Sequence, residues 1–155
     1  KEPSIPKKTK SVSMIASNKI MCMGHAIRHG WIQRLHDKVD FFGRGFKEIE
    51  SKEEGLNDYR FSVAIENCSV PNYFTEKLGD CFATGTIPVY IGCSNIGQFF
   101  NPDGIIRLSH ELELESLTEE LYLSKIDAVK ENFKRIQKYE IPEDWIYETY
   151  KEMFN

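Results

Sequence analysis

The stretch from Phe61 to Gly92 constrains the fold of this chain more than any other part of the sequence. Apolar runs at Phe61–Asn67 and Ile87–Gly92 predict two strands. Between them, Thr75–Thr84 carries apolar residues at helical spacing, starts on a capping residue, and is followed by Gly85, which suits the left-handed position after a helix. This is a β-α-β unit, so we expect parallel strands joined by a right-handed crossover.

The same alternation continues on both sides of this unit. The further expected elements are strands at 11–17, 39–43 and 105–109, helices at 25–35, 94–100 and 116–137, and a last helix from Pro142 to Phe154. Alternating strands and helices predict an α/β fold with a Rossmann-like parallel sheet flanked by helices. Within the 155 residues we expect a linker at 1–10 and one domain at 11–155.

Composition excludes several classes of function. The net charge is -4, with 20 Lys and Arg against 24 Asp and Glu, so a general nucleic-acid binder is not expected. No apolar run reaches the ~20 residues of a membrane helix, so we expect no transmembrane segment in this chain. The four cysteines form no CxxC pair, which argues against a zinc site. Unpaired cysteines and an unused Asn67-Cys68-Ser69 sequon favour a cytoplasmic or membrane-peripheral location over a secretory lumen.

The best candidate site is the polar loop after the strand Phe61–Asn67. In parallel sheets, ligands collect at the carboxyl ends of the strands, and the start of the following helix attracts anions. Lys77 in the first helical turn adds a positive charge, and Glu76 can accept hydrogen bonds from two sugar hydroxyls. A cation beside a carboxylate suits a nucleotide. The alternative is ordinary helix capping at Thr75, with Lys77 on the surface.

Two arginines are further candidates. Arg28 lies in the first turn of the expected helix 25–35, at the same edge of the sheet, and an arginine can bind phosphate through two parallel hydrogen bonds. A solvent-facing helix arginine is the alternative. Arg44 lies in the turn Gly43-Arg44-Gly45, which is too short for a phosphate-binding glycine loop but allows Arg44 to reach a ligand.

Longer motifs in the same segment resemble a known family. The sequence Tyr59–Gly92, with Glu-Asn after the strand, then Tyr-x-Thr-Glu-Lys, then a Pro-Val strand ending in glycine, resembles the C-terminal domain of the α-1,3-fucosyltransferases of glycosyltransferase family 10. Ile15–Asn18 and Ala26–Arg28 are similar to that family as well. Phe74 departs from it, because the family usually has Ile or Val there.

This resemblance implies one half of a two-domain GT-B glycosyltransferase, the half that binds the donor GDP-fucose. By the resemblance, Arg28 and Lys77 contact the diphosphate. Glu76 and Tyr73 contact the ribose and its surroundings, and Asn67 lies close to the donor sugar. Asn18 and Arg44 are possible additional donor-binding residues.

The implied reaction is an inverting transfer of fucose to a hydroxyl of a glycan acceptor, as in protein glycosylation. The family's general base belongs to an N-terminal domain that is missing here, so we assign no catalytic residue and expect this chain alone to be inactive. We expect no cofactor and no metal, because the cations can neutralise the departing diphosphate. Two alternatives stay open: a nucleotide-binding module without catalysis, and a transferase that uses a different nucleotide sugar.

Overall fold

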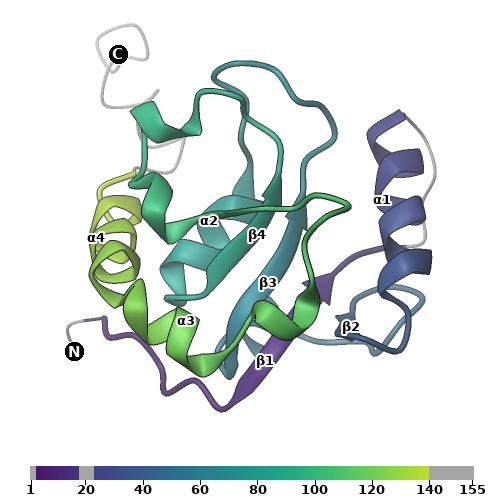
Figure 1. Ribbon diagram of the computed structural model, residues 1–155, viewed down its shortest axis with the longest axis horizontal. Coiled ribbons are helices and arrows are strands. Elements are labelled where there is room, and N and C mark those ends of the chain that lie inside the picture. The colour runs from purple at the N-terminus through teal and green to yellow at the C-terminus, as the bar shows by residue number, and fades with distance from the viewer. Residues whose placement is uncertain (1–2, 18–22, 140–155) are drawn as a thin grey trace, which may run out of the picture.

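Five parallel strands form the sheet of this computed structural model, which describes residues 3–17 and 23–139 (Figure 1). The strand order is β2-β1-β3-β4-β5. The strands are β1 (Lys10–Ile15), β2 (Asp40–Phe42), β3 (Tyr59–Ile65), β4 (Ile87–Ile91) and β5 (Ile106–Arg107). The helices are α1 (Met23–Leu35), α2 (Glu76–Ala83), α3 (Glu119–Ser124) and α4 (Ile126–Ile136), and a short 3-10 helix, η1 (Lys52–Gly55), follows β2. This is the α/β architecture that the sequence predicts.

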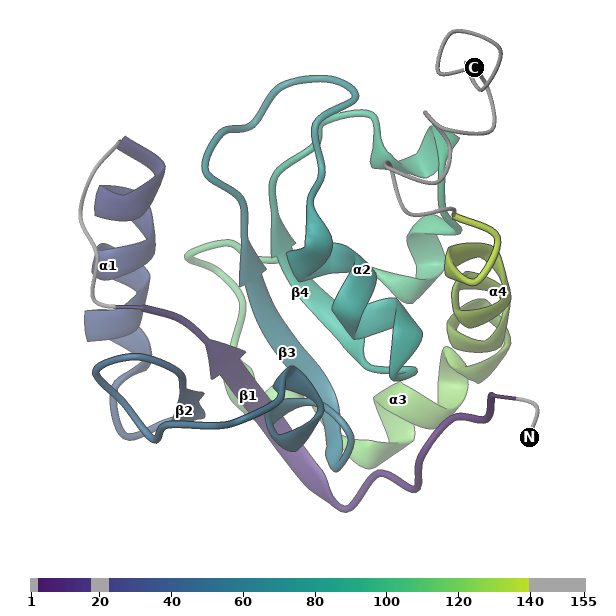
Figure 2. The same ribbon diagram turned by 180° about the vertical axis from the view of Figure 1, so that it is seen from behind.

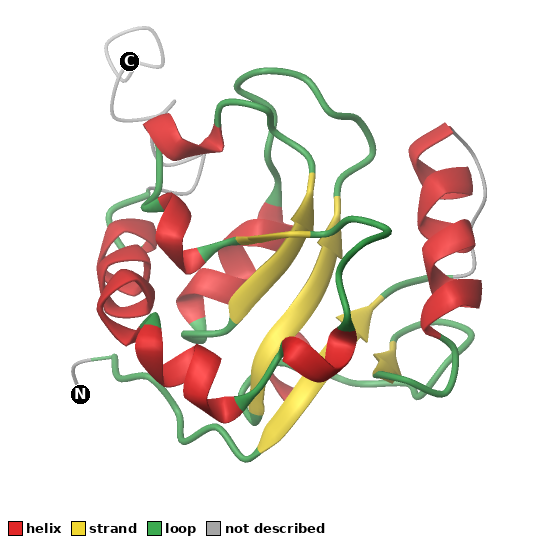
Figure 3. Cartoon of the chain, in the orientation of Figure 1, coloured by secondary structure: helices red, strands yellow, loops and turns green. Residues whose placement is uncertain are grey.

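Apolar side chains cover both faces of the sheet, because successive residues of a strand point to opposite sides. On β3, Phe61, Val63 and Ile65 pack on one face with residues of α1, α3 and α4. Ala64 points to the other face, where it packs with residues of α2. Figure 2 shows α2 in front of β3 and β4, and Figure 3 shows helices on both sides of the strands.

Local signals in the β-α-β unit are confirmed. The side-chain oxygen of Thr75 caps α2 by accepting from the backbone N–H of Lys77, and Gly85 has a φ of 68°. β3 and β4 pair in parallel, with Val63 opposite Val89.

The predicted helix at 116–137 is wrong as a single helix. The chain forms α3 and α4 with a break at Lys125, which ends the first helix and precedes the second. The apolar positions Leu121 and Ile126 are five residues apart, which departs from the spacing of three or four within one helix face. The expected short helix at 94–100 is only a 3-10 turn, at Ile96–Gln98. The helix expected from Pro142 lies outside the described residues.

Candidate functional site

A cavity of about 300 Å³ lies at the carboxyl ends of β1 and β3. Its floor is formed by residues Met14–Ser17 from β1 and the segment after it, and by Ser62–Ile65 from β3. The connections that follow these two neighbouring strands lead in opposite directions along the sheet. From β1 the chain goes on to β2 on one side, and from β3 it goes on to β4 on the other. Open α/β sheets of this order bind ligands at this switch point.

Positive charge dominates the cavity although the chain as a whole is acidic. Four cationic side chains line it, and they come from four different segments: Arg28, Arg44, Lys52 and Lys77. Two carboxylates face them, Glu76 and Asp80, both on α2. The lining residues therefore carry a net charge of about +2 from these six side chains, four cations less two anions. Such a concave surface attracts an anion.

Arg28 is the most informative of these cations. Its residue is only 7 % exposed. Its Nε is buried and has no hydrogen-bond partner among the described residues. Buried polar groups of native proteins are nearly always paired. His29 Nε2 is likewise buried without a partner among the described residues, but only Arg28 lines the cavity, so an anion bound there is a candidate partner for the Arg28 guanidinium. The solvent-facing alternative for Arg28 is therefore wrong.

The start of α2 is fixed by Glu66, which follows β3 and whose side chain is fully buried. Glu66 Oε1 accepts from the backbone N–H of Thr75 at 2.8 Å, and Glu66 Oε2 accepts from the Thr75 hydroxyl at 2.7 Å. In a capping box the third residue of the helix makes the first of these bonds. Here that residue is Leu78, and a carboxylate from the neighbouring strand replaces it.

Lys77 belongs to the same network. Its Nζ donates to Thr75 Oγ1 at 3.1 Å and lies 3.6 Å from Glu66 Oε2 and 3.5 Å from Glu76 Oε1. The side chain keeps 26 % of its surface exposed, so the ammonium group is held in place and remains accessible. The cation thus lies beside the free N–H groups of α2, where both favour negative charge.

Glu76 is ionised at neutral pH. Burial alone would raise the pKa of its carboxyl, but Lys77, the backbone amide of Glu76 itself and Lys52 together lower that pKa below its ordinary value. The side chain is 58 % exposed, which leaves its oxygens available to the hydroxyls of a ligand. Glu76 is therefore an acceptor at the mouth of the cavity.

The structure brings together four of the seven residues predicted from the sequence: Arg28, Arg44, Glu76 and Lys77. Asn67 and Tyr73 lie on the loop between β3 and α2, and neither is among the described residues that line the cavity. A pair of hydrogen bonds between Asn72 and Asn95 ties this loop to the segment after β4. Asn18 lies outside the described residues.

Three charged residues in or beside the cavity were missed by sequence reasoning. Glu66 ends an apolar strand, and this position was a usable signal for a buried, functional carboxylate. Lys52 and Asp80 offered no local signal, because they are brought together only by the packing of η1 beside α2.

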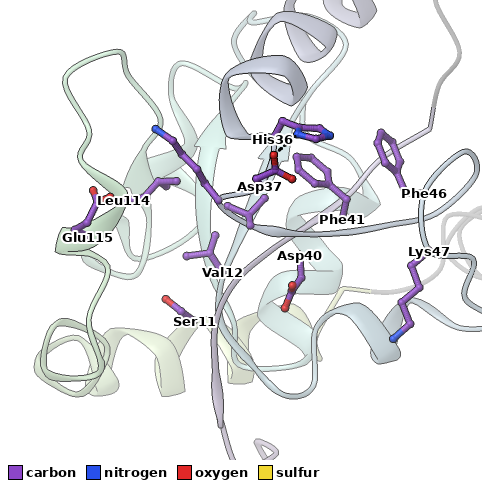
Figure 4. Close-up of a pocket in the computed structure, with 12 residues that line it drawn as sticks. Ser11, Val12, His36, Asp37, Asp40, Phe41, Phe46, Lys47, Leu114 and Glu115 are labelled. Carbon is purple, nitrogen blue, oxygen red and sulfur yellow. Dashed lines mark ion pairs between the residues drawn. The ribbon is translucent and has the colours of Figure 1, made fainter.

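A larger hollow of about 840 Å³ lies at the amino ends of β1 and β2 (Figure 4). Three of its charged or titratable groups, His36, Asp37 and Asp40, have partners within the chain. His36 pairs with Asp37 at 2.9 Å, and Asp40 accepts a hydrogen bond from the Tyr59 hydroxyl at 2.7 Å. Figure 4 shows Phe41 and Phe46 with their rings side by side, and these rings stack on each other. The hollow is therefore larger, but it does not lie at the carboxyl ends of the strands, where parallel sheets bind ligands.

The described residues contain no helix long and apolar enough to cross a membrane. Within the same residues, no group of three His, Cys, Asp or Glu side chains is arranged to hold a metal ion.

Comparison with known proteins identifies the family. The sequence model of "Glycosyltransferase family 10 (fucosyltransferase) C-term" matches residues 5–151. The chain belongs to glycosyltransferase family 10. The match covers both β1 and α4, so the family assignment extends to the whole sheet and all the cations of the cavity.

Named relatives of this family 10 chain include fucosyltransferases from bacteria and primates. The chain is 28% identical over 113 residues to the α-(1,3)-fucosyltransferase FucT of Helicobacter pylori, which covers 69% of this chain and 23% of that protein. It is 32% identical over 106 residues to a human 3-α-L-fucosyltransferase, with coverage of 65% and 29%. The matched segments thus make up less than a third of the length of these relatives.

A solved structure has the same fold. The crystal structure of an α1,3-fucosyltransferase with GDP-fucose superposes with a TM-score of 0.61 at 22% sequence identity. The superposition covers 89% of this chain and 50% of the other chain. The five-stranded parallel sheet is therefore one half of a GT-B architecture.

Proposed function

We propose that this chain is the donor-binding half of an inverting fucosyltransferase that transfers fucose from GDP-fucose to a hydroxyl of a glycan. Membership of family 10 and the likeness to a fucosyltransferase solved with GDP-fucose support this proposal. The observation that carries it is the buried Nε of Arg28, which has no partner in the described part of the chain, in a cavity that also holds Lys77 and the start of α2.

In the proposed reaction, the acceptor oxygen attacks the anomeric carbon of fucose on the face opposite the nucleotide. The bond from that carbon to the diphosphate oxygen breaks, and the electron pair leaves with GDP. Arg28, Lys77 and the N–H groups of α2 stabilise the negative charge that grows on the diphosphate. Groups already oriented toward developing charge are worth several kcal/mol in such sites, roughly 3 to 4 for one donor.

The acceptor hydroxyl must also lose a proton. No carboxylate of this chain is assigned to that step, because Glu66 is fully engaged by Thr75 and Lys77, and Glu76 is proposed to bind the ribose. We propose that the base and most of the acceptor site belong to an N-terminal domain. We also propose that the donor site works without a divalent metal ion, because Arg28 and Lys77 neutralise the diphosphate in its place.

Titration of the chain with GDP in a calorimeter, with EDTA present, tests the donor site without needing transfer activity. We expect the Lys77→Ala variant to bind GDP about 10 to 100 times more weakly, because a hydrogen bond to a charged group contributes ~1.5 to 3 kcal/mol. Lys38→Ala is the matched control, since Lys38 is exposed and lines the larger hollow instead. Equal GDP affinity in the wild type and Lys77→Ala would remove Lys77 from the site.

A further inference from the structure

The cavity contains an ion pair to which the proposed function assigns no role. Lys52 Nζ lies 2.6 Å from Asp80 Oδ2, and both side chains line the cavity. They are 48% and 33% exposed, and an ion pair of this kind contributes less than about 1 kcal/mol to stability. The pair therefore adds little to the fold, and its position in the cavity wall needs another explanation.

The position of Asp80 on α2 relates it to the proposed ribose site. Asp80 follows Glu76 by four residues, so both carboxylates project from the same face of the helix, about 6 Å apart along its axis. In a nucleoside diphosphate the ribose lies between the phosphates and the base. With the diphosphate at Lys77 and the ribose at Glu76, the next group along the helix is the base.

The Lys52–Asp80 pair has the polar pattern of one particular base. Guanine presents on one edge an acceptor, O6, followed by two donors, N1–H and the 2-amino group. A carboxylate accepts from the two adjacent donors, and an ammonium beside it donates to O6, as lysine does to guanine in nucleic-acid complexes. Uracil offers a carboxylate one donor in place of two, and adenine has no donor at N1.

Apolar walls of the same cavity suit the faces of a flat ring. Leu56, Ala64 and Cys81 line the same cavity, and each is less than 5 % exposed. Burial raises the pKa of the Cys81 thiol to about 12, so this wall stays uncharged at neutral pH. Apolar walls with a few placed polar groups are typical of sites that bind a small ligand specifically.

We propose that Asp80 and Lys52 are the specificity-determining residues that select guanine as the base of the donor. Asp80 accepts hydrogen bonds from N1–H and the 2-amino group, and Lys52 donates to O6. This inference rests on the proposed function, since it takes the donor to be a nucleotide sugar whose diphosphate lies at Arg28 and Lys77.

Calorimetric titration with four nucleoside diphosphates tests the proposal. For the wild type we expect GDP to bind most tightly. IDP lacks the 2-amino group and should bind about 10-fold more weakly, because it loses one hydrogen bond to a charged group. XDP places a carbonyl oxygen against Asp80 and should lose about 100-fold, and UDP should bind more weakly than GDP by a similar factor.

The Asp80→Asn variant should reverse the preference between GDP and XDP. The side-chain amide can donate to the 2-carbonyl of xanthine, and it can no longer accept from both donors of guanine. Glu131→Gln is the matched control, because Glu131 forms a comparably exposed ion pair with Arg135 on α4, away from the cavity. It should keep the preference for GDP unchanged.

The outcomes separate this inference from the proposed function. If the wild type binds GDP but Asp80→Asn keeps the same ratio of GDP to XDP affinity, the base-reading role is wrong and the donor site stands. Equal affinity of the wild type for GDP and IDP, or for GDP and UDP, also overturns the inference. This outcome needs no variant, so the inference can be tested even if Asp80→Asn folds poorly. If the wild type binds none of the four diphosphates, the proposed function itself fails.

Discussion

Two buried cations lie near opposite ends of the sheet, and they differ in how their polar atoms are satisfied. Lys8 is 9 % exposed and Arg28 is 7 % exposed. The Nζ of Lys8, near the amino ends of β3 and β4, donates to four oxygens of the chain: the carbonyls of Leu56, Asn57 and Thr84 and the hydroxyl of Thr86. Arg28, at the carboxyl ends, has a buried Nε without a partner among the described residues.

This difference supports the proposal that Lys8 is a structural cation and Arg28 a binding cation. A buried charge is costly unless it is well paired, so a fold retains one either because the chain satisfies it or because a ligand does. Lys8 joins the segment before β1 to the turns before β3 and β4, and so closes the base of the domain. Arg28 Nε makes no such hydrogen bond to the described residues, which is the basis of the proposal that Arg28 binds an anion.

The same substitution at the two positions should therefore have opposite effects. Lys8→Met keeps the aliphatic length of the side chain but removes the donor shared by four acceptors. Leaving buried acceptors unpaired costs ~1 to 3 kcal/mol, and we expect the free energy of unfolding to fall by about 3 kcal/mol. Urea denaturation followed by circular dichroism measures this loss.

GDP affinity is the second readout for Lys8→Met. Its folded fraction should bind GDP as the wild type does, because Lys8 does not line the cavity. An unchanged free energy of unfolding would show that Lys8 does not stabilise the fold. A loss of GDP affinity in the folded protein would show that Lys8 contributes to binding.

Arg28→Met should give the complementary result, with a somewhat smaller energy. We expect GDP to bind roughly 30-fold more weakly, which corresponds to about 2 kcal/mol, because a charge-assisted hydrogen bond to phosphate is lost. Stability should stay the same or rise slightly, since Arg28 has no ion-pair partner in the described part of the chain and an apolar side chain of similar length relieves its desolvation cost.

Calorimetry and thermal melting of Arg28→Met check both parts of this prediction. Lys47→Met is the control for the loss of a cation outside the cavity, because Lys47 lines the larger hollow of Figure 4 instead. If Arg28→Met unfolds easily while binding GDP normally, Arg28 is a structural cation like Lys8.

The contrast also shows which features a single sequence can predict. Strands β3 and β4 and the cap of α2 depend on neighbouring residues, so periodicity and capping rules found them. The helix break at Lys125 was missed because apolar spacing continues on both sides of it. The only local sign of the break is the spacing of five between the apolar Leu121 and Ile126.

The site was partly predictable for the same reason. Glu76 and Lys77 were found because they start a helix after a strand. Whether Arg28 is buried depends on how α1 packs against the rest of the domain, and no local pattern carries that information. The role of Glu66 depends on Thr75, nine residues away, and the Lys52–Asp80 pair depends on packing across 28 residues. Long-range contacts of this kind are fixed by the fold and not by the residues beside them.

The pH dependence of stability gives the smallest and most selective test of the comparison. Burial lowers the pKa of Lys8 from 10.5 to about 8, with Cys81 and Asp58 acting weakly in the opposite direction. In the unfolded chain the ammonium keeps its proton up to about pH 10.5. Between these two values the unfolded state binds more protons than the folded state, so the free energy of unfolding rises with pH.

From pH 7.5 to 8.5 this rise amounts to roughly 0.7 kcal/mol for a folded pKa near 8. Urea denaturation at the two pH values measures it, and the difference between wild type and Lys8→Met cancels the contributions of other groups. Arg28→Met should keep the full rise, because a guanidinium does not titrate in this range. If Lys8→Met shows the same rise as the wild type, Lys8 is not the group responsible for it. Burial would then not lower the pKa of Lys8 below that of a surface lysine.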